Sequence, residues 1–444
     1  MKALDLLRLP RLSAPSAETR WLALALWILA GLAALLLVVR WQDAMQQPLN
    51  IFPAYYTAAK LIERGGDIAQ FYEDKWFMQR VDEFAPGRLE TYNANTPMLG
   101  FFFLPLAKLS YEDARRLTSV LAFTALMAAM VLMIRELKVS GVWRGAAVLA
   151  VFTAPTTLVN LGLAQVYPIV LLLFVLIWLS WRRARCAIGG AFLGIAIAFK
   201  TAGVFLVPLM FLERRWRALS AMVAVIAVLV ALTFPFVGYG AWTAYLQDAR
   251  NLSRGPGLAF PGYLSVTGFA RNLFLYDGRL NRDPYFDAPL LATSIEVLAL
   301  IGLLGLAIRT AAKATDRDIT FALFMMISLI LIPVTSNAHL CLGFLPAFIM
   351  FSRLKDRLIS WMGATFLAGG YLSFGPSVER LRGLVDWGGP VFFYPRLLGL
   401  IMLVGVLIAL GQQTASRPGT SRTGDEWEQD ADHAKRIETV EADR

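Results

Sequence analysis

The feature that most constrains this chain is a series of apolar runs that recurs along nearly all of its 444 residues. Each run is near or above the length of about 20 helical residues that crosses a hydrocarbon core. Hydrophobic residues make up 57% of the chain and charged residues 17%, whereas about one quarter of a soluble domain is charged. The sequence therefore predicts an all-α, polytopic transmembrane bundle that forms one membrane-embedded domain.

Ten apolar runs bounded by charge are predicted to be full spans, with ends placed to within a few residues. They are 21–41, 114–134, 143–160, 167–181, 217–237, 289–309, 318–335, 338–352, 357–374 and 393–411. Residues 186–212 lie between two basic clusters and are too few for two spans, so they predict a short helical hairpin that turns near Lys200. A single crossing there is the alternative, and it would invert the topology of everything downstream.

The net charge of +10 has its explanation in the membrane topology. Most Lys and Arg residues bracket apolar runs, as at 182–185 and 214–217, which is the positive-inside pattern. The pattern places both termini in the cytoplasm of a cell (inner) membrane and the loops 42–113 and 238–288 outside, and it argues against nucleic acid as a partner. The two cysteines, Cys186 and Cys341, exclude a disulfide framework or a thiolate metal site.

The chain divides into a cytoplasmic segment 1–20, a transmembrane domain 21–411 and a disordered cytoplasmic tail 412–444. Loops as long as 42–113 are usually functional. Within it, 52–64 and 72–84 have the spacing of short amphipathic helices on a membrane surface. Residues 101–109, with Pro105 in the middle, predict a re-entrant segment.

Polar residues at membrane depth or at the outer ends of spans are costly there and mark candidate sites. Lys200 has about twelve apolar residues on each side and needs either snorkelling or an anionic partner such as a lipid phosphate. Gln165 and His339 could hydrogen-bond a sugar or a neighbouring helix. Tyr55 and Tyr56 could line a sugar site or belong to the interfacial aromatic belt. Gly189, Gly190 and Gly194 indicate close helix packing.

Six sequence blocks carry a resemblance to a known family. They are Asn50-Ile-Phe-Pro-Ala-Tyr-Tyr-Thr-Ala-Ala, Tyr92-Asn-Ala-Asn95-Thr-Pro, Phe101-Phe-Phe-Leu-Pro-Leu-Ala, Ala164-Gln165, Gly189-Gly190 through Lys200 to Arg214-Arg-Trp-Arg217, and Ser336-Asn-Ala-His339. Their order resembles the glycosyltransferases of family 87, which have the GT-C architecture, over roughly residues 20–410. The resemblance implies transfer of a sugar, mannose or another hexose, from a polyprenyl-phosphate carrier to an extracytoplasmic glycan or glycolipid acceptor, without a metal or other cofactor.

The resemblance also implies roles for individual residues. The acceptor loses a proton to a carboxylate, and cationic groups stabilise the leaving phosphate. Together with the residue patterns, the resemblance gives Asn50, Asp43 and Asp67 for catalysis, Lys200 and Arg271 for the donor phosphate, and Tyr55, Tyr56, Asn95, Gln165 and His339 for substrate binding. Asp43 and Arg271 could instead be solvated loop residues.

The chain departs from the family pattern at Asn50, where an acid is expected, and at Ala164 and Thr201. Asparagine cannot act as a base. Either another carboxylate of the first outer loop, such as Asp43, Asp67 or Asp74, replaces it, or the chain is a catalytically silent member. A transporter or flippase of lipid-linked glycans is the rival from another class.

Overall fold

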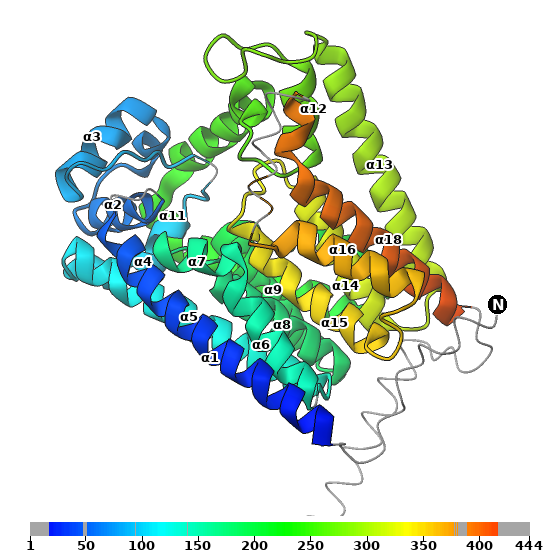
Figure 1. The fold of residues 1–444 in the computed structure, drawn as a ribbon. Coiled ribbons are helices and arrows are strands. Elements are labelled where there is room, and N and C mark those ends of the chain that lie inside the picture. Colours follow the sequence, from blue (N-terminus) through cyan, green and yellow to red (C-terminus); the bar gives the residue numbers. More distant parts are fainter. Residues whose placement is uncertain are drawn as a thin grey trace, which may run out of the picture.

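A computed structural model describes residues 17–47, 51–93, 95–139, 141–376, 378, 380 and 389–415. Every regular element in these ranges is a helix, and the β-type pairing there is limited to one isolated bridge between Asp277 and Asn281. The prediction of an all-α chain is confirmed. Figure 1 shows the long helices side by side in a bundle, with α2, α3 and α12 gathered at one end.

Five helices are long and apolar enough to cross a membrane. They are α1 (Ala17–Gln46), α5 (Tyr111–Glu136), α11 (Trp216–Arg254), α13 (Pro289–Lys313) and α18 (Pro395–Ala415). A sixth candidate is the pair α6 (Val142–Thr153) and α7 (Pro155–Gly162), which is bent by 51°. The bend falls where Pro155 disfavours a helical conformation of the residue before it. The chain is thus a membrane protein, while ten full spans stay a prediction.

Four shorter helices lie within other predicted spans. They are α8 (Tyr167–Arg182), α14 (Arg317–Leu331), α15 (Phe344–Leu354, after the 3-10 turn η6, His339–Gly343) and α16 (Trp361–Phe374). Most residues of α8 and α14 are buried, as expected for helices that are apolar on all sides. These two helices form the centre of the bundle, where protein rather than lipid covers them.

Residues 186–212 form two helical pieces joined by a sharp turn. They are α9 (Cys186–Lys200) and α10 (Val207–Leu212), with η4 (Val204–Leu206) between them. Thr201 and Gly203 both have positive φ, 50° and 90°, which reverses the chain direction. The two ends of the segment meet again, because Arg215 Nη1 lies 3.6 Å from Cys186 Sγ. This return agrees with the predicted hairpin and not with a single crossing.

The glycines of α9 allow it to lie directly on α11. A Cβ on Gly190 would be 2.0 Å from the carbonyl oxygen of Ala218, and one on Gly194 would be 2.8 Å from that of Met222. No side chain fits in that space. The prediction that these glycines serve helix packing is confirmed.

The predicted surface helices of the first loop exist, but one is placed differently. They are α2 (Phe52–Glu63) and α3 (Asp74–Phe84). Nine of the twelve residues of α2 are buried, so its predicted position on the membrane surface is wrong. Its aromatic side chains pack inside the protein, for example the Tyr55 ring on Phe103 at 4.8 Å. The segment predicted to be re-entrant forms α4 (Leu99–Phe103) and η3 (Leu104–Lys108), which pack against α2.

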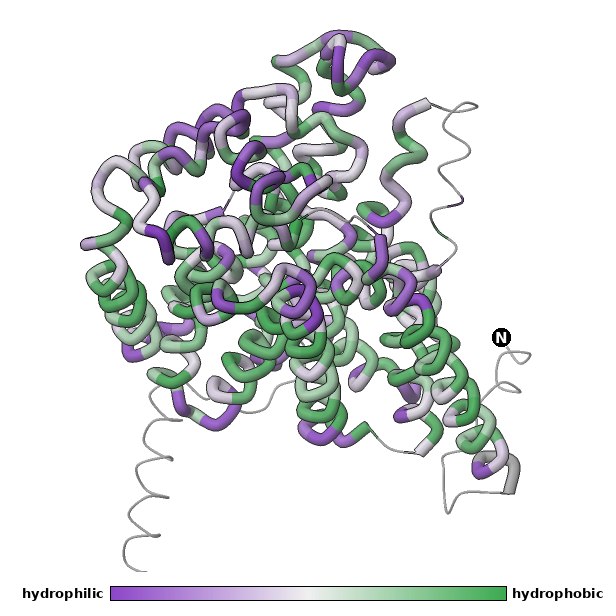
Figure 2. Tube along the Cα trace, turned by 90° about the vertical axis from the view of Figure 1, so that its left-hand side faces the viewer, coloured by the Kyte–Doolittle hydropathy of each residue, from purple (hydrophilic) through white to green (hydrophobic). Residues whose placement is uncertain are grey.

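The second predicted outer loop begins later than expected. α11 passes through a break at Gly238 (φ 67°, ψ 172°) and continues to Arg254, where it packs against η2 (Ile68–Tyr72). The rest of this loop carries η5 (Pro256–Ala259) and α12 (Val266–Phe274), and η8 (Pro390–Phe393) precedes α18. Figure 2 shows that this end of the molecule is more hydrophilic than the bundle below it.

Arg115 fixes the first loop to the bundle. Its side chain is fully buried and donates to the carbonyl oxygens of Ala44, Met45 and Gln47 at 2.9 to 3.2 Å, and to that of Gly162 at 2.9 Å. The last carbonyls of a helix have no partner within the helix. Arg115 therefore satisfies the end of α1 and ties it to the end of α7.

Candidate functional site

Lys200 lies at the end of α9, and its ammonium group contacts neutral side chains from three other elements. Its Nζ donates to Asn95 Oδ1 at 2.9 Å. The same nitrogen lies 4.6 Å from the ring centre of Tyr55 and 5.7 Å from that of Tyr167, which are cation–π distances. None of these three partners carries a charge, so they orient the ammonium group without neutralising it.

Two hydrogen-bonded pairs extend the contacts of this ammonium group. The hydroxyl of Tyr55 donates to Gln165 Oε1 at 3.0 Å, and the hydroxyl oxygen of Tyr167 lies 2.6 Å from His339 Nε2. The backbone N–H of Ser336 donates to the other ring nitrogen, Nδ1, so the neutral ring carries its proton on Nε2. The structure thus joins five predicted site residues in one network: Tyr55, Asn95, Gln165, Lys200 and His339.

Glu90 is a carboxyl group near this network, and it was not among the predicted site residues. The half-buried side chain accepts from the backbone N–H of Ile51 at 2.6 Å and from that of Thr91 at 3.0 Å. Burial raises the pKa of the Glu90 carboxyl above its ordinary value. The two backbone hydrogen bonds and the charge of Lys200 lower this pKa, but by less than burial raises it. Glu90 is therefore the carboxyl group that lies within electrostatic reach of the Lys200 ammonium.

Glu90 contacts Ile51, the described residue that comes next in sequence after the position where the family pattern has an acid. Ile51 directly follows Asn50 in the chain. It has φ 86°, a conformation that a β-branched residue rarely adopts and that is often found at functional sites. The available sequence signal was that Glu90 comes just before the block 92–97.

The loop that carries Asn95 is fixed to its neighbours by backbone contacts. The hydroxyl of Tyr72 donates to the carbonyl oxygen of Asn95 at 2.9 Å. Thr96 Oγ1 donates to the carbonyl oxygen of Ala198 at 3.1 Å, and Ala198 lies two residues before Lys200 on α9. The structure therefore holds the backbone on both sides of the Lys200–Asn95 bond.

The second predicted outer loop closes over the same region. The N–H of Leu264 donates to the carbonyl of Thr335 at 2.6 Å, and the Ser265 hydroxyl donates to that of Pro333 at 2.7 Å. Burial raises the pKa of Tyr263, and the charge of Glu90 adds to the effect. Tyr263 is therefore within electrostatic range of Glu90.

Two predicted site residues have partners outside the network. Arg271 forms an ion pair with Glu296, at 2.7 and 3.2 Å, and donates to the carbonyl of Gly255 at 3.1 Å. The hydroxyl of Tyr56 donates to the carbonyl of Leu109 at 2.7 Å. Their roles toward the donor phosphate and the substrate stay predictions.

The predicted catalytic residues are not in the network as far as the structure describes them. Asp43 is exposed near the end of α1. Asp67 is exposed and caps η2, where it accepts from the N–H of Ala69 at 2.9 Å. Asn50 lies outside the described residues, and Asp74 accepts from Asn93 Nδ2 at 2.9 Å. No cluster of three His, Cys, Asp or Glu suited to a metal ion occurs in the described ranges.

One cavity borders this network, and another lies elsewhere in the same bundle. A polar cleft of about 510 Å³ is lined by residues of η2, α3 and α11, among them Tyr72, whose hydroxyl binds the Asn95 carbonyl. An apolar groove of about 390 Å³ lies between α6, α15 and α16. Phe344 lines this groove directly after η6, which begins at His339. The polar cleft thus borders the site through Tyr72, and the apolar groove is connected to His339 only along the chain, through η6.

Comparison with known proteins gives one clear match. The model of glycosyltransferase family 87 matches residues 93–334, just over half of the chain. The matched stretch contains Asn95, Gln165 and Lys200, and it begins after Glu90. No curated protein matches the chain.

Proposed function

Because this chain belongs to glycosyltransferase family 87, we propose that it transfers mannose or another hexose from a polyprenyl-phosphate carrier to an extracytoplasmic glycan or glycolipid. The family makes the chain a membrane glycosyltransferase, and the donor and acceptor are our proposal. The observation that carries the proposal is that the half-buried carboxyl group of Glu90 lies within electrostatic reach of the Lys200 ammonium group.

In the proposed reaction, an acceptor hydroxyl attacks C1 of the donor sugar. The bond between C1 and the phosphate oxygen breaks as the new glycosidic bond forms. The carboxylate of Glu90 takes the hydroxyl proton as a general base. The ammonium of Lys200 stabilises the negative charge that develops on the polyprenyl phosphate as it leaves.

The donor site is supported by the charge and the setting of Lys200. Its ammonium is oriented by an amide and two aromatic rings, so an incoming phosphate meets a cation already in place. The groove beside α15 is apolar, as a site for a polyprenyl chain must be. Phe344, one of its lining residues, directly follows η6 in the chain. The proposed donor therefore enters sideways from the lipid.

The acceptor site is supported by the polar cleft. Its lining combines an aromatic ring, Trp76, with the amides of Asn93 and Asn251 and the carboxylates of Asp74 and Asp248. Sugars are bound by such combinations of flat apolar faces and hydrogen-bonding groups. Tyr72, which lines the cleft, donates to the backbone carbonyl of Asn95. The side chain of the same asparagine accepts from Lys200.

The test uses purified full-length protein in nanodiscs and a panel of radiolabelled polyprenyl-phosphate hexoses. We expect transfer from at least one donor to a glycan or glycolipid acceptor, and no loss of activity in EDTA. Lys200→Met should reduce kcat/KM by about 10² or more, the size typical of a lost charge-stabilising group. Lys108→Met, an exposed lysine at the end of η3, is the matched control.

The rival functions give different results in the same assay. A flippase would move labelled lipid across a vesicle membrane without transferring sugar from any donor. A catalytically silent member would bind a donor without transfer. Either result in the wild-type protein contradicts the proposed activity.

A further inference from the structure

A third cavity lies at the other end of α9 from Lys200. It has a volume of about 550 Å³ and is lined by the end of α8, the start of α9, residues 213–217 and the start of α14. Cys186, the first residue of α9, lines it, and Lys200 is the last residue of the same helix. Fifteen helical residues span about 22 Å, so this cavity is separate from the proposed active site. It lies on the predicted cytoplasmic side.

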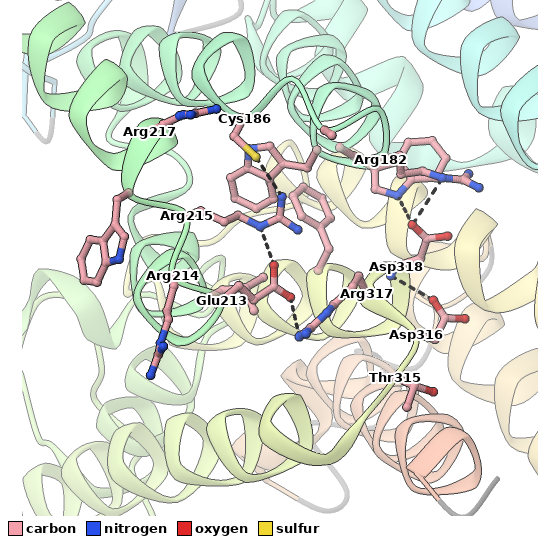
Figure 3. A pocket seen from close by; sticks show the side chains of 16 residues that line it. Arg182, Cys186, Glu213, Arg214, Arg215, Arg217, Thr315, Asp316, Arg317 and Asp318 are labelled. Atoms are coloured by element: carbon pink, nitrogen blue, oxygen red, sulfur yellow. Dashed lines mark hydrogen bonds and ion pairs between the residues drawn. The ribbon is translucent and has the colours of Figure 1, made fainter. Parts of the chain in front are cut away.

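The cavity carries more positive than negative charge. Its lining has five arginines and three carboxylates: Arg182, Arg214, Arg215, Arg217 and Arg317 with Glu213, Asp316 and Asp318. Figure 3 shows Glu213 between Arg215 and Arg317, with ion-pair distances of 2.5 and 3.1 Å. The lining residues together carry an excess of two positive charges. Glu136 and Arg353, which pair with lining residues from outside, add one charge of each sign.

Aromatic side chains hold the guanidinium groups of the cavity in place. Arg215 lies over the ring of Trp181 at 4.8 Å, and Arg182 lies over that of Trp178 at 5.0 Å. Trp178 Nε1 also donates to Asp318 at 2.8 Å. Stacked arginines with fixed planes are suited to binding phosphate oxygens in pairs.

The rim of the cavity is apolar and exposed. Trp216 lines it with 55% of its surface exposed, and Phe211, 50% exposed, packs edge-on against Trp216 with ring centres 5.6 Å apart. Tryptophan is enriched where protein meets lipid headgroups. α11, which begins at Trp216, is the longest candidate span, and only 11% of its apolar window is buried inside the protein. The cavity therefore opens where an acyl chain could lie on the rim.

We propose that this cavity binds the headgroup phosphate of an anionic phospholipid, whose acyl chains lie on Phe211 and Trp216. Basic pockets between helices on the cytoplasmic side are suited to such headgroups. The charge excess selects an anion, and the exposed aromatic rim selects a lipid over a free phosphate. Bound lipid would link α8, α9, α11 and α14, and with them the hairpin that carries Lys200.

The experiment compares the full-length protein in nanodiscs of phosphatidylcholine alone and of phosphatidylcholine with phosphatidylglycerol. We expect phosphatidylglycerol to raise the apparent Tm by about 2 °C or more and to remain bound in native mass spectra. Arg214→Gln should reduce retained phosphatidylglycerol, and Arg214→Gln combined with Arg317→Gln should reduce it about tenfold, the effect of losing charged hydrogen bonds. Arg135→Gln, an exposed arginine at the end of α5 outside the cavity, is the control.

Three outcomes would overturn the proposal. One is equal retention of phosphatidylglycerol by the double variant and by Arg135→Gln, with both proteins folded in phosphatidylcholine. Another is equal retention by Arg214→Glu and wild type, since a reversed charge at the mouth must repel the lipid. The last is an equal Tm shift with inorganic phosphate or glycerol phosphate, which would assign the cavity to a soluble anion. Sugar transfer can fail or succeed independently of all three.

Discussion

Glu90 combines a raised pKa with a place beside Lys200, and the two together predict a pH dependence. The base must be ionised, so activity rises as the pH rises through its pKa. Burial raises that pKa, so the acid limb of kcat/KM should lie above pH 4.3, about the ordinary pKa of a glutamate. Glu90→Gln should lower kcat by about 10² to 10⁴ and remove this limb.

The control for this prediction is Glu83→Gln, a change in an exposed carboxylate of the same loop that pairs with Arg64 and Arg80. It should leave the pH profile unchanged. Near wild-type activity in Glu90→Gln would return the role of base to the predicted residues Asp43 and Asp67, or show that another group takes the proton.

Arg115 gives a prediction about stability. It is fully buried and donates to four carbonyl oxygens. Arg115→Met would leave these acceptors without their donor in the protein interior, which costs about 1 to 3 kcal/mol for each buried group left unpaired. We expect a loss of about 3 kcal/mol or more in the free energy of unfolding, measured by denaturant titration in detergent. Arg116→Met removes the neighbouring exposed arginine and should have little effect.

The individual site residues show which positions a sequence can reveal. Lys200, Gln165 and His339 were found because polar side chains are costly at membrane depth and therefore rarely lie there by chance. Glu90 lies in a loop, where a charge costs little and carries no signal of its own. The partner of Arg271 is Glu296 on α13, and no local pattern connects residues from different elements.

At the scale of helices, the contact between α9 and α11 predicts strict size limits. Gly190→Ala would put a Cβ 2.0 Å from the Ala218 carbonyl oxygen, so α9 must move away from α11. We expect a loss of about 1 to 3 kcal/mol, the usual cost of overpacking, seen as a lower unfolding midpoint. Gly370→Ala, on α16 with no atom near its Cβ position, should be neutral or slightly stabilising because alanine favours helices. Equal midpoints for the two variants would contradict the close packing.

The helices themselves were predictable to different degrees. The apolar spacing of 52–64 predicted α2 to within one residue of its end, because local periodicity decides where a helix forms. It did not predict that α2 is buried, since burial depends on α4, η3 and α5, which pack against it. α11 runs beyond its predicted end at 237 because hydropathy marks where an apolar run stops, and a helix can continue past that point.

For the whole molecule, the decisive question is which side of the membrane each loop faces. The hairpin at 186–212 puts residues 67 and 279, one in each predicted outer loop, on the same side, whereas a single crossing would put them on opposite sides. We expect Asp67→Cys and Arg279→Cys to react with a membrane-impermeant maleimide on intact cells. Arg135→Cys, at the opposite end of α5, should react only after permeabilisation.

The background for this experiment is the protein with Cys186→Ala and Cys341→Ala, which should not react. Cys341 is buried and Cys186 lies in the arginine-lined cavity, so both can be replaced by a smaller apolar residue without a change of charge. Protection of residue 279 while residue 67 reacts would establish the single crossing. Lys200 would then end a span that continues through the membrane, and the two outer loops could not close over one site. Reaction at both positions keeps Glu90, Lys200 and Tyr263 on the side where the proposed acceptor is found.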